Sequence, residues 1–438
     1  MKDINSIKKD IFELVNNYSD IKFSKKEFLP GISEIPAAGK YIDNSEMINM
    51  VDACLDGWLT TGRFNAEFEN KLAKYLKVKS LFTVNSGSSA NLVSFSALTS
   101  PKLKERAIKE GDEIITVAAG FPTTVNPLLF YKTIPVFIDV KVGNYNIDEN
   151  QIESAITKNT KAIVLAHTLG NPFNLEVVKS ICEKYKLWLI EDTCDALGAK
   201  YNNQKVGTFG DFGTLSFYPA HHITMGEGGA VFTNNPILRR IAESFRDWGR
   251  DCFCGPGEDN SCKRRFCWQL GDLPRGYDHK YTYSHAGFNF KITDMQAACG
   301  LAQLEKLEKF IETRNKNFDY LFKKMTTLEE YFILPERTKY SEPSWFGFPL
   351  TIRNHDLISR KDLTLFLEER RIGTRLLFGG NLTKQPYFKN INYKIHNNLK
   401  NSDKITQDTF WVGIHPSLDN DMLDYIYESI KSFLKKNV

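Results

Sequence analysis

Two adjacent histidines, His221 and His222, lie in the segment LSFYPAHHITMGEGGAVF at residues 215–232. The segment predicts a strand, a turn, a glycine-rich loop and a second strand, an order typical of the wall of a cofactor pocket. Ser216 and the glycines that follow suit a phosphate and a flat ring, because small residues let the backbone approach a ligand closely. The turn of such a pocket usually carries a lysine, whose amine forms an imine with a cofactor aldehyde.

The absence of this lysine changes the chemistry that the pocket can perform. No lysine occurs between Lys205 and Lys263. An imidazole forms no stable imine, but it can act as a base near neutral pH because its unperturbed pKa is about 6.5. We therefore expect a cofactor that is not tethered to the chain and a histidine that moves protons. A degenerate pocket without activity is the alternative.

A second candidate for phosphate binding lies at residues 84–98, VNSGSSANLVSFSAL, which predicts a strand, a small polar turn and a helix. The turn contains Ser86, Gly87 and Ser88. Backbone N–H groups and hydroxyls at a helix N-terminus favour a phosphate, because the helix dipole is positive there. A helix cap with a tight turn is the alternative interpretation.

Three further candidates follow predicted strands, where open α/β sheets bind ligands. Asp192 ends the apolar run 187–192 and would keep a pyridine nitrogen protonated, which makes the cofactor a better electron sink. Phe121 offers a ring that can stack on a flat cofactor. His167 ends another strand. Taken singly, each also fits a structural role, as a capping carboxylate, a core aromatic or a satisfied buried histidine.

The cysteines are unevenly distributed. Of eight cysteines, three lie close together at residues 252–262, and a fourth follows two residues after Asp192. Disulfides are not expected in a reducing cytosol, so clustered cysteines are either buried thiols or metal ligands. The irregular segment 251–285, which interrupts the pattern of the chain, is long enough to wrap a metal.

Composition excludes several classes of function. The formal net charge is +4 and the basic residues are scattered, which gives little support for nucleic-acid binding. No apolar run approaches the roughly 18 residues that cross a membrane. Residues 1–20 predict an amphipathic helix of mixed charge without an apolar signal core. We expect a cytoplasmic protein.

The elements that must position these side chains alternate along the chain. Apolar runs predict strands, with helices such as 175–186 between them, over 80–84, 112–117, 134–140, 161–167 and 187–192. This alternation predicts an α/β fold with a mostly parallel sheet covered on both faces. We expect an N-terminal arm and helices over 1–65, a large cofactor-binding domain over 66–300 with the insertion 251–285, and a small C-terminal α+β domain over 301–438. A single helix is predicted over 291–325, and a strand over 344–352.

In their order and spacing, these motifs resemble the nucleotide-sugar aminotransferases, pyridoxal-phosphate (PLP) enzymes of the aspartate-aminotransferase fold (fold type I). The resemblance covers most of the chain and includes the segments 57–62, 287–307 and 373–386. It implies that Asp192 pairs with the pyridine nitrogen, that Phe121 stacks on the ring, and that the phosphate and ring contacts come from Ser86, Gly87, Ser88, His167 and Ser216. It also implies that Asn289 reaches the cofactor of a partner subunit, so that a homodimer shares its active sites.

The family's sequence Ser-Phe-Tyr-Pro-Ala-Lys places the imine-forming lysine at the position of His221, with His222 one residue away as an alternative. This exchange resembles the 3-dehydratases of nucleotide-linked 4-keto-6-deoxyhexoses. In those enzymes pyridoxamine phosphate (PMP) binds through its amine to the sugar ketone, a histidine removes a proton from the cofactor, and the C3 hydroxyl leaves. The resemblance implies that His221 is the catalytic base.

The spacing C-x57-C-x-C-x7-C of Cys194, Cys252, Cys254 and Cys262 resembles the branch of these dehydratases that acts on CDP-4-keto-6-deoxy-D-glucose. That branch carries a 2Fe–2S cluster and receives electrons from an NADH-dependent flavin and iron–sulfur reductase. The four cysteines match the four thiolates that such a cluster needs, and a cluster beside the cofactor is expected. Cys267 in place of Cys262, a zinc site, and unrelated thiols remain alternatives.

The resemblance therefore implies a PMP-dependent C3 dehydratase in the synthesis of a 3,6-dideoxyhexose for surface polysaccharide. Arg375 and His222 are candidates for binding the nucleotide sugar. A cluster-free dehydratase that releases a 3-deoxy-4-keto sugar is one alternative, and a non-catalytic protein that binds a sugar or cofactor is another.

Overall fold

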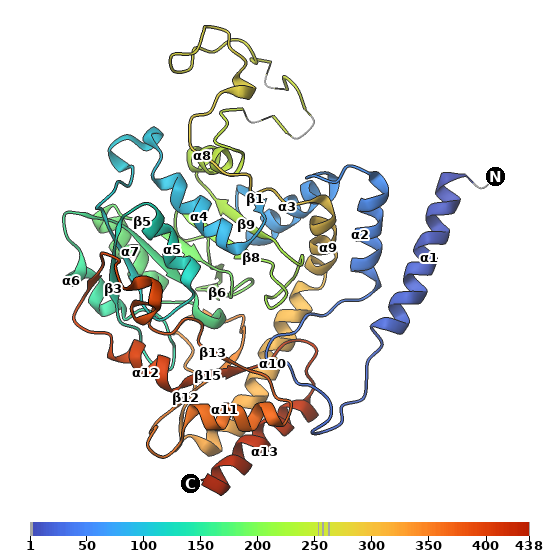
Figure 1. The fold of residues 1–438 in the computed structure, drawn as a ribbon, viewed down its shortest axis with the longest axis vertical. Coiled ribbons are helices and arrows are strands. Elements are labelled where there is room, and N and C mark those ends of the chain that lie inside the picture. The colour runs from blue at the N-terminus through green and yellow to red at the C-terminus, as the bar shows by residue number, and fades with distance from the viewer. Residues whose placement is uncertain (1–2, 253, 256–257, 262, 438) are drawn as a thin grey trace.

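The computed structural model describes residues 3–252, 254–255, 258–261 and 263–437, so that Cys262 lies outside the described residues. Figure 1 shows a large sheet among helices, a smaller sheet with helices below it, and helix α1 set to one side. No helix in the described part of the chain combines the length and apolarity that a membrane span requires.

The described α-helices are α1 (Ile4–Lys22), α2 (Asn44–Asp56), α3 (Arg63–Leu76), α4 (Gly87–Leu98), α5 (Pro122–Phe130), α6 (Ile152–Ala155), α7 (Leu175–Tyr185), α8 (Pro236–Arg246), α9 (Asp294–Leu304), α10 (Leu307–Met325), α11 (Arg360–Glu369), α12 (Lys400–Asp408) and α13 (Asn420–Asn437).

The described strands are β1 (Ser80–Val84), β2 (Glu113–Val117), β3 (Ile134–Ile138), β4 (Thr160–Ala166), β5 (Trp188–Asp192), β6 (Lys200–Tyr201), β7 (Gln204–Lys205), β8 (Phe212–Ser216), β9 (Gly229–Thr233), β10 (Phe332–Ile333), β11 (Ser341–Glu342), β12 (Phe348–Ile352), β13 (Thr374–Leu376), β14 (Lys394–Ile395) and β15 (Thr409–Val412).

The large sheet has the order β1-β9-β8-β5-β4-β2-β3-β14. Pairing is parallel from β8 through β5, β4, β2 and β3 to β14, whereas β9 runs antiparallel to both β8 and β1. The five strands predicted between residues 80 and 192 are all present, and the predicted fold class is confirmed. The carboxyl ends of β4, β5 and β8 lie next to one another, which brings the residues that follow them to one edge of the sheet.

Alternating side chains of the central strands enter two separate cores, which explains why these strands are apolar at nearly every position. Ile115 and Leu189 belong to the core covered by α7. Ile114 and Ile190 belong to the core covered by α4 and α8. Because both faces of the sheet are buried in these cores, side chains that contact a ligand are expected where the strands end.

The smaller sheet, β10-β12-β15-β13, packs with α10, α11 and α13 around a core of its own. The prediction of one helix over 291–325 is wrong, because α9 ends at Leu304 and α10 begins at Leu307. Lys306 lies at the break, where its amine contacts the carboxylates of Glu46 at 2.6 Å and Asp43 at 2.7 Å. These contacts connect the break between the two helices to α2. Helix α9 packs against α2 and α3, whereas α10 packs in the core of the small sheet.

The segment 251–285 projects beyond α8 in Figure 1. Among its described residues, the regular elements are a single 3-10 turn at His279–Tyr281 and bridges at its base. The insertion over 251–285, like the other domain boundaries, stays a prediction.

One buried carboxylate joins the N-terminal region to the large domain. Helix α3 begins after Gly62, which has no side chain to cap it. Asp294 of α9 supplies this cap, because its carboxylate accepts the backbone N–H groups of Gly62 at 2.9 Å, Phe64 at 3.2 Å and Asn65 at 2.8 Å. Asp294 is only 3% exposed, so these bonds replace its contacts with water.

We expect Asp294→Ala to lower the free energy of unfolding by about 2 kcal/mol, since it removes a helix cap and leaves buried N–H groups unpaired. Denaturant unfolding monitored by circular dichroism measures this change. Asp421→Ala, in the exposed first turn of α13, serves as the control. Equal stability of the two variants would contradict the assigned capping role.

Candidate active site

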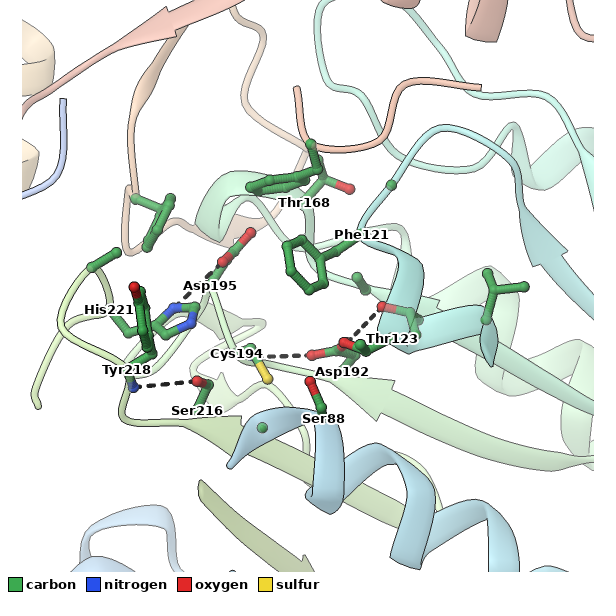
Figure 2. Close-up of a pocket in the computed structure, with 18 of the residues that line it drawn as sticks. Ser88, Phe121, Thr123, Thr168, Asp192, Cys194, Asp195, Ser216, Tyr218 and His221 are labelled. Atoms are coloured by element: carbon green, nitrogen blue, oxygen red, sulfur yellow. Dashed lines mark hydrogen bonds and ion pairs between the residues drawn. The ribbon is translucent and has the colours of Figure 1, made fainter. Parts of the chain in front are cut away.

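A cavity of about 600 Å³ lies at the carboxyl ends of the central strands and is closed on one side by the small domain. Figure 2 shows Ser88 and Ser216 on one side of this space, Phe121 on another, and His221 with Asp195 on a third. The cavity is lined by most of the predicted site residues, namely Ser86, Gly87, Ser88, Phe121, Asp192, Cys194, Ser216, His221 and Arg375.

One end of the cavity is built from the start of α4 and the end of β8. Ser86 caps the helix, since its hydroxyl accepts the N–H of Ser89 at 3.0 Å. A Cβ atom on Gly87 would lie 2.5 Å from the Cβ of Ser216, so only glycine permits the helix to approach β8 this closely. Ser88, at the start of α4, and Ser216 lie on the same side of the cavity, and hydroxyls beside a helix N-terminus suit a phosphate.

The carboxylate of Asp192 is held in place by three hydrogen bonds. The side-chain amide of Asn91 and the hydroxyl of Thr124 each donate to Oδ2 at 2.7 Å, and the N–H of Cys194 donates to Oδ1 at 3.1 Å. The side chain is 6% exposed and lines the cavity. Such a fixed carboxylate can pair with a protonated ring nitrogen of a bound ligand.

Aromatic and basic side chains line the cavity toward the small domain. The ring of Phe121 is half exposed and packs edge-on against Phe378, with the ring centroids 5.7 Å apart. Arg375 lies on β13 at the rim, where its guanidinium donates to the carbonyl of Thr374 at 2.7 Å. A flat ring bound between Phe121 and the strand ends would place its substituents toward this basic rim.

His221 lies at the turn after β8, in the cavity. Its Nδ1 is 3.5 Å from Oδ1 of Asp195, and its ring lies against Phe346, with centroids 5.2 Å apart. Burial lowers the pKa of His221 to about 4, despite the opposing effect of Asp192. Burial and the nearby Asp192 carboxylate raise the pKa of Asp195 to about 8. At neutral pH the imidazole is therefore neutral, as a base must be.

His222 is placed differently. It is 3% exposed, and its Nε2 is 2.9 Å from the backbone carbonyl of Ser344. It does not line the cavity that contains His221. Of the two adjacent histidines, the geometry brings only His221 to the other predicted site residues.

His167 also lies outside the cavity lining, although its neighbours Ala166 and Thr168 belong to it. Its ring is fully buried and stacks on Phe173 at 4.2 Å, and its Nε2 is 3.1 Å from Glu191. Adjacent residues of an extended chain point to opposite sides, which explains why the histidine faces the core. This position corresponds to the structural alternative rather than to a cofactor contact.

Asn289 lies away from this cavity within the single chain. Its backbone pairs with Asp247, and its side-chain oxygen accepts the amine of Lys291 at 2.8 Å. Its expected contact with a partner's cofactor involves a second chain and stays a prediction.

The cysteines are divided between two places. Cys194 lines the cavity, where burial and the Asp192 carboxylate raise the pKa of its thiol well above the usual value. Cys252 and Cys254 lie on the projecting segment, and their sulfur atoms and one nitrogen of His279 are all within 4.8 Å of one another. Cys194 is not part of that group. Of the four expected cysteines, Cys252 and Cys254 lie together, Cys194 lines the cavity, and Cys262 lies outside the described residues.

The sequence interpretation missed several residues of the site. Asn91 and Thr124, which hold Asp192, lie inside helices and follow no recognisable motif. Asp195, which faces His221, is the third acidic residue in the run EDTCD. This acidic run is the sequence feature that could have identified Asp195 as a site residue. Phe346 and Trp411 reach the cavity from the small domain, and only the tertiary fold places them there.

The raised pKa of Asp195 gives a pH-dependent prediction. Between its unfolded pKa of about 3.9 and its folded value of about 8, the folded chain binds more protons than the unfolded chain, so this group lowers stability as pH rises. We expect Asp195→Asn to raise the Tm of the cofactor-free protein at pH 8 and to have little effect at pH 4. A Tm difference that does not increase between these two pH values would contradict the assignment.

Comparisons with known proteins identify relatives along nearly the whole chain. The lipopolysaccharide biosynthesis protein RfbH of Salmonella typhimurium is 58% identical over 433 residues, which cover 99% of each chain. The dTDP-4-dehydro-2,6-dideoxy-D-glucose 3-dehydratase of Saccharopolyspora spinosa is 48% identical over 94% of this chain and 88% of that protein. The structure of the E. coli GDP-4-keto-6-deoxy-D-mannose-3-dehydratase with bound hydrated PLP matches with a TM-score of 0.81 and 31% identity over 90% of this chain and 99% of that one.

The cavity contains the groups that a phosphorylated pyridine requires: a helix N-terminus for the phosphate, a fixed carboxylate for the ring nitrogen and an aromatic ring for stacking. The model of the DegT/DnrJ/EryC1/StrS aminotransferase family matches residues 41–431. The chain belongs to the DegT/DnrJ/EryC1/StrS aminotransferase family.

Proposed function

We propose that this chain is a PMP-dependent 3-dehydratase of a nucleotide-linked 4-keto-6-deoxyhexose. The observation that carries the proposal is a cavity lined by Ser88, Asp192 and Ser216, in which His221 occupies the position of the imine-forming lysine. Among the described residues that line the cavity there is no lysine. Transamination needs that lysine, whereas removal of a hydroxyl group as water needs a group that takes up a proton and returns it to the leaving hydroxyl, which a histidine can do.

The names of the relatives support the reaction class. Two of the similar proteins are named 3-dehydratases of 4-keto sugars linked to dTDP or GDP, and a third is named for lipopolysaccharide biosynthesis. We propose CDP-4-keto-6-deoxy-D-glucose as the substrate, in the synthesis of a 3,6-dideoxyhexose for surface polysaccharide. The proposal of a CDP-linked sugar rests on the cysteine spacing, because no described residue of the cavity indicates which nucleotide base is bound.

PMP, when bound, supplies an amine for the sugar ketone and a ring that takes up negative charge. Asp192 keeps the ring nitrogen protonated, which raises the capacity of the ring for that charge. Ser88, Ser216 and the N-terminus of α4 hold the phosphate and so fix the cofactor without a covalent bond.

His221 is neutral at pH 7 and takes up the proton in this mechanism. Its Nδ1 faces Asp195, so Nε2 would take up a proton from C4′ of bound PMP and would pass it to the C3 hydroxyl of the sugar, which leaves as water. Phe346 and Phe121 limit the access of water to the reacting atoms. Arg375 at the rim is suited to the diphosphate of the nucleotide sugar.

We further propose that the chain holds a 2Fe–2S cluster and receives electrons from an NADH-dependent flavin and iron–sulfur reductase. The support is the spacing of Cys194, Cys252, Cys254 and Cys262, of which the last lies outside the described residues. Cys252 and Cys254 lie together on the projecting segment, whereas Cys194 lines the cavity. A homodimer, with Asn289 directed to the partner's cofactor, belongs to the same proposal.

A cluster-free dehydratase is the second candidate, and the position of Cys194 in the cavity favours it. This enzyme would release a 3-deoxy-4-keto sugar without a reductase. Anaerobic reconstitution with iron and sulfide separates the two: a coloured protein whose turnover depends on the reductase supports the first, and a colourless protein with reductase-independent turnover supports the second.

We expect His221→Asn to lower the rate of dehydration by about 10²- to 10⁴-fold, because it removes a general base. The rate is measured with CDP-4-keto-6-deoxy-D-glucose, PMP and the reductase. His222→Asn is the matched control and is expected to keep the rate within a few-fold of wild type, since His222 bonds to a backbone carbonyl away from the cavity. A larger loss in His222→Asn than in His221→Asn would reverse the assignment.

The variant His221→Lys restores the residue that forms an imine in aminotransferases. With PLP added, we expect an absorption band of the internal imine, which wild type lacks, together with loss of dehydration. An unchanged dehydration rate in this variant would show that the base is elsewhere. A wild-type protein that converts no nucleotide sugar at all would favour a non-catalytic binding protein.

A further inference from the structure

Arg314 of α10 is a buried cation to which the proposed mechanism assigns no role. Its side chain is 1% exposed, and it is not one of the residues that line the cavity. Burying a guanidinium is costly unless hydrogen-bond acceptors surround it. The acceptors that Arg314 binds therefore indicate what the residue does.

The guanidinium of Arg314 binds backbone carbonyls of two segments that lie far apart in the sequence. Nη1 donates to the carbonyl of Phe346 at 3.0 Å. Nη2 lies between the carbonyls of Ala220, at 3.5 Å, and His221, at 3.4 Å, and donates to both. Ala220 and His221 follow β8 of the large sheet, whereas Phe346 precedes β12 of the small sheet. One side chain thus connects the turn that carries His221 to a segment next to the small sheet.

The segment that contains Phe346 also contacts the base directly. The ring of Phe346 lies against the imidazole of His221, with the ring centroids 5.2 Å apart, and it lines the cavity. The N–H of Phe346 donates to the carbonyl of Leu169 at 2.9 Å, which fixes the segment at the end of β4. Arg314 therefore binds the backbone of His221 and the backbone of the residue whose ring lies against it.

A second contact joins the same two segments. Nε2 of His222 is 2.9 Å from the carbonyl of Ser344, and the N–H of Ser344 donates to the carbonyl of Gly170 at 3.0 Å. Burial holds the pKa of His222 well below its usual range, so this contact is made by a neutral ring. The contact at Arg314 is charged, and it reaches the carbonyl of His221 itself.

The titratable and charged groups around His221 come from different elements. Asp195 is 3.5 Å from its Nδ1, Asp192 ends β5, His222 is the next residue in the turn, and Arg314 comes from α10. Burial is the main cause that lowers the pKa of His221 to about 4; the Asp192 carboxylate opposes this effect and the Arg314 guanidinium adds to it. Burial lowers the pKa of Arg314 only to about 10, so that its guanidinium is charged at pH 7.

We propose that Arg314 is a positioning residue for His221: its guanidinium holds the turn that carries the base and the Phe346 ring beside the base in one fixed arrangement. Its positive charge also disfavours a proton on the imidazole of the resting protein. The role of His221 as the base rests on the proposed function, whereas the contacts and the charge of Arg314 do not.

The test compares variants of the full-length protein that separate the charge of Arg314 from its geometry. Arg314→Met removes the charge and the donors from a side chain of similar length. Arg314→Lys keeps the charge, but a compact ammonium group cannot replace the planar fork that reaches all of these carbonyls. Lys316→Met, at an exposed position two residues further along α10, is the control. Circular dichroism and thermal unfolding establish that each variant is folded.

The first measurement is an NMR titration of the cofactor-free protein with carbon-13-labelled histidine. The signal of His221 is identified by its absence in His221→Asn. We expect a titration midpoint near 4 in wild type, in Arg314→Lys and in Lys316→Met. In Arg314→Met we expect the midpoint to move upward by roughly one pH unit, because a positive charge near the imidazole is lost.

The second measurement is the dehydration rate per folded chain, with CDP-4-keto-6-deoxy-D-glucose, PMP and the reductase. We expect Arg314→Met to lower kcat by roughly 10- to 100-fold and to leave KM for the sugar within about threefold, because a misplaced base slows the reaction more than it weakens binding. Arg314→Lys is expected to lose roughly three- to tenfold in kcat, and Lys316→Met to match wild type.

A folded Arg314→Met with the kcat of wild type would overturn the positioning role, whatever its titration midpoint. A lower Tm with an unchanged kcat per folded chain and an unchanged midpoint would show a purely structural role and would also overturn it. If Arg314→Met does not fold, Arg314→Lys decides: a lower kcat at an unchanged midpoint supports the proposal, and an unchanged kcat contradicts it.

The two measurements also separate this proposal from the proposed function. Wild type that dehydrates no nucleotide sugar contradicts the proposed function. In that case the titration still tests Arg314: an upward movement of the His221 midpoint in Arg314→Met, but not in Arg314→Lys, supports its influence on the imidazole, and equal midpoints in all variants overturn it.

Discussion

The site depends on the fixed carboxylate of Asp192 at the end of β5. This carboxylate is buried, and it accepts three hydrogen bonds, from Asn91, Thr124 and the backbone of Cys194. A carboxylate so placed has satisfied its own hydrogen-bonding needs and still presents a negative charge to the cavity. Because its partners come from α4, α5 and the strand end itself, the packing of both helices on the sheet is a condition for the cofactor chemistry.

The negative charge of Asp192 also affects the pKa values of Asp195 and of the proposed base, His221. Burial, together with Asp192, raises the pKa of Asp195, and burial lowers that of His221, so a protonated carboxyl faces a neutral imidazole at pH 7. A lysine at this turn would be both tether and base, whereas a histidine can be only the base. In the proposed function, Ser88 and Ser216 hold the phosphate of the untethered cofactor at the N-terminus of α4, where the helix dipole favours an anion.

Much of the fold and part of the site could be predicted from the sequence. Strand ends followed by small polar or acidic residues are local signals, and Ser88, Asp192 and Ser216 carry them. Contacts between residues far apart in the sequence have no such signal: Phe346, two residues before β12, lines the same cavity as Asp192. His279 lies 25 residues after Cys254, in a segment without periodicity, and the backbone bridge between Arg250 and Tyr283 brings the two ends of that segment together. The break at Lys306 also arises from a distant partner, α2.

The central claim is that the cofactor binds without a covalent link to the chain. Its most direct test is reduction of the PLP-loaded protein with borohydride, followed by mass spectrometry of the denatured chain. The account predicts an unmodified chain mass and complete release of the cofactor, because no lysine lines the cavity among the described residues. A chain heavier by one pyridoxyl group, with the label on a lysine, would contradict it.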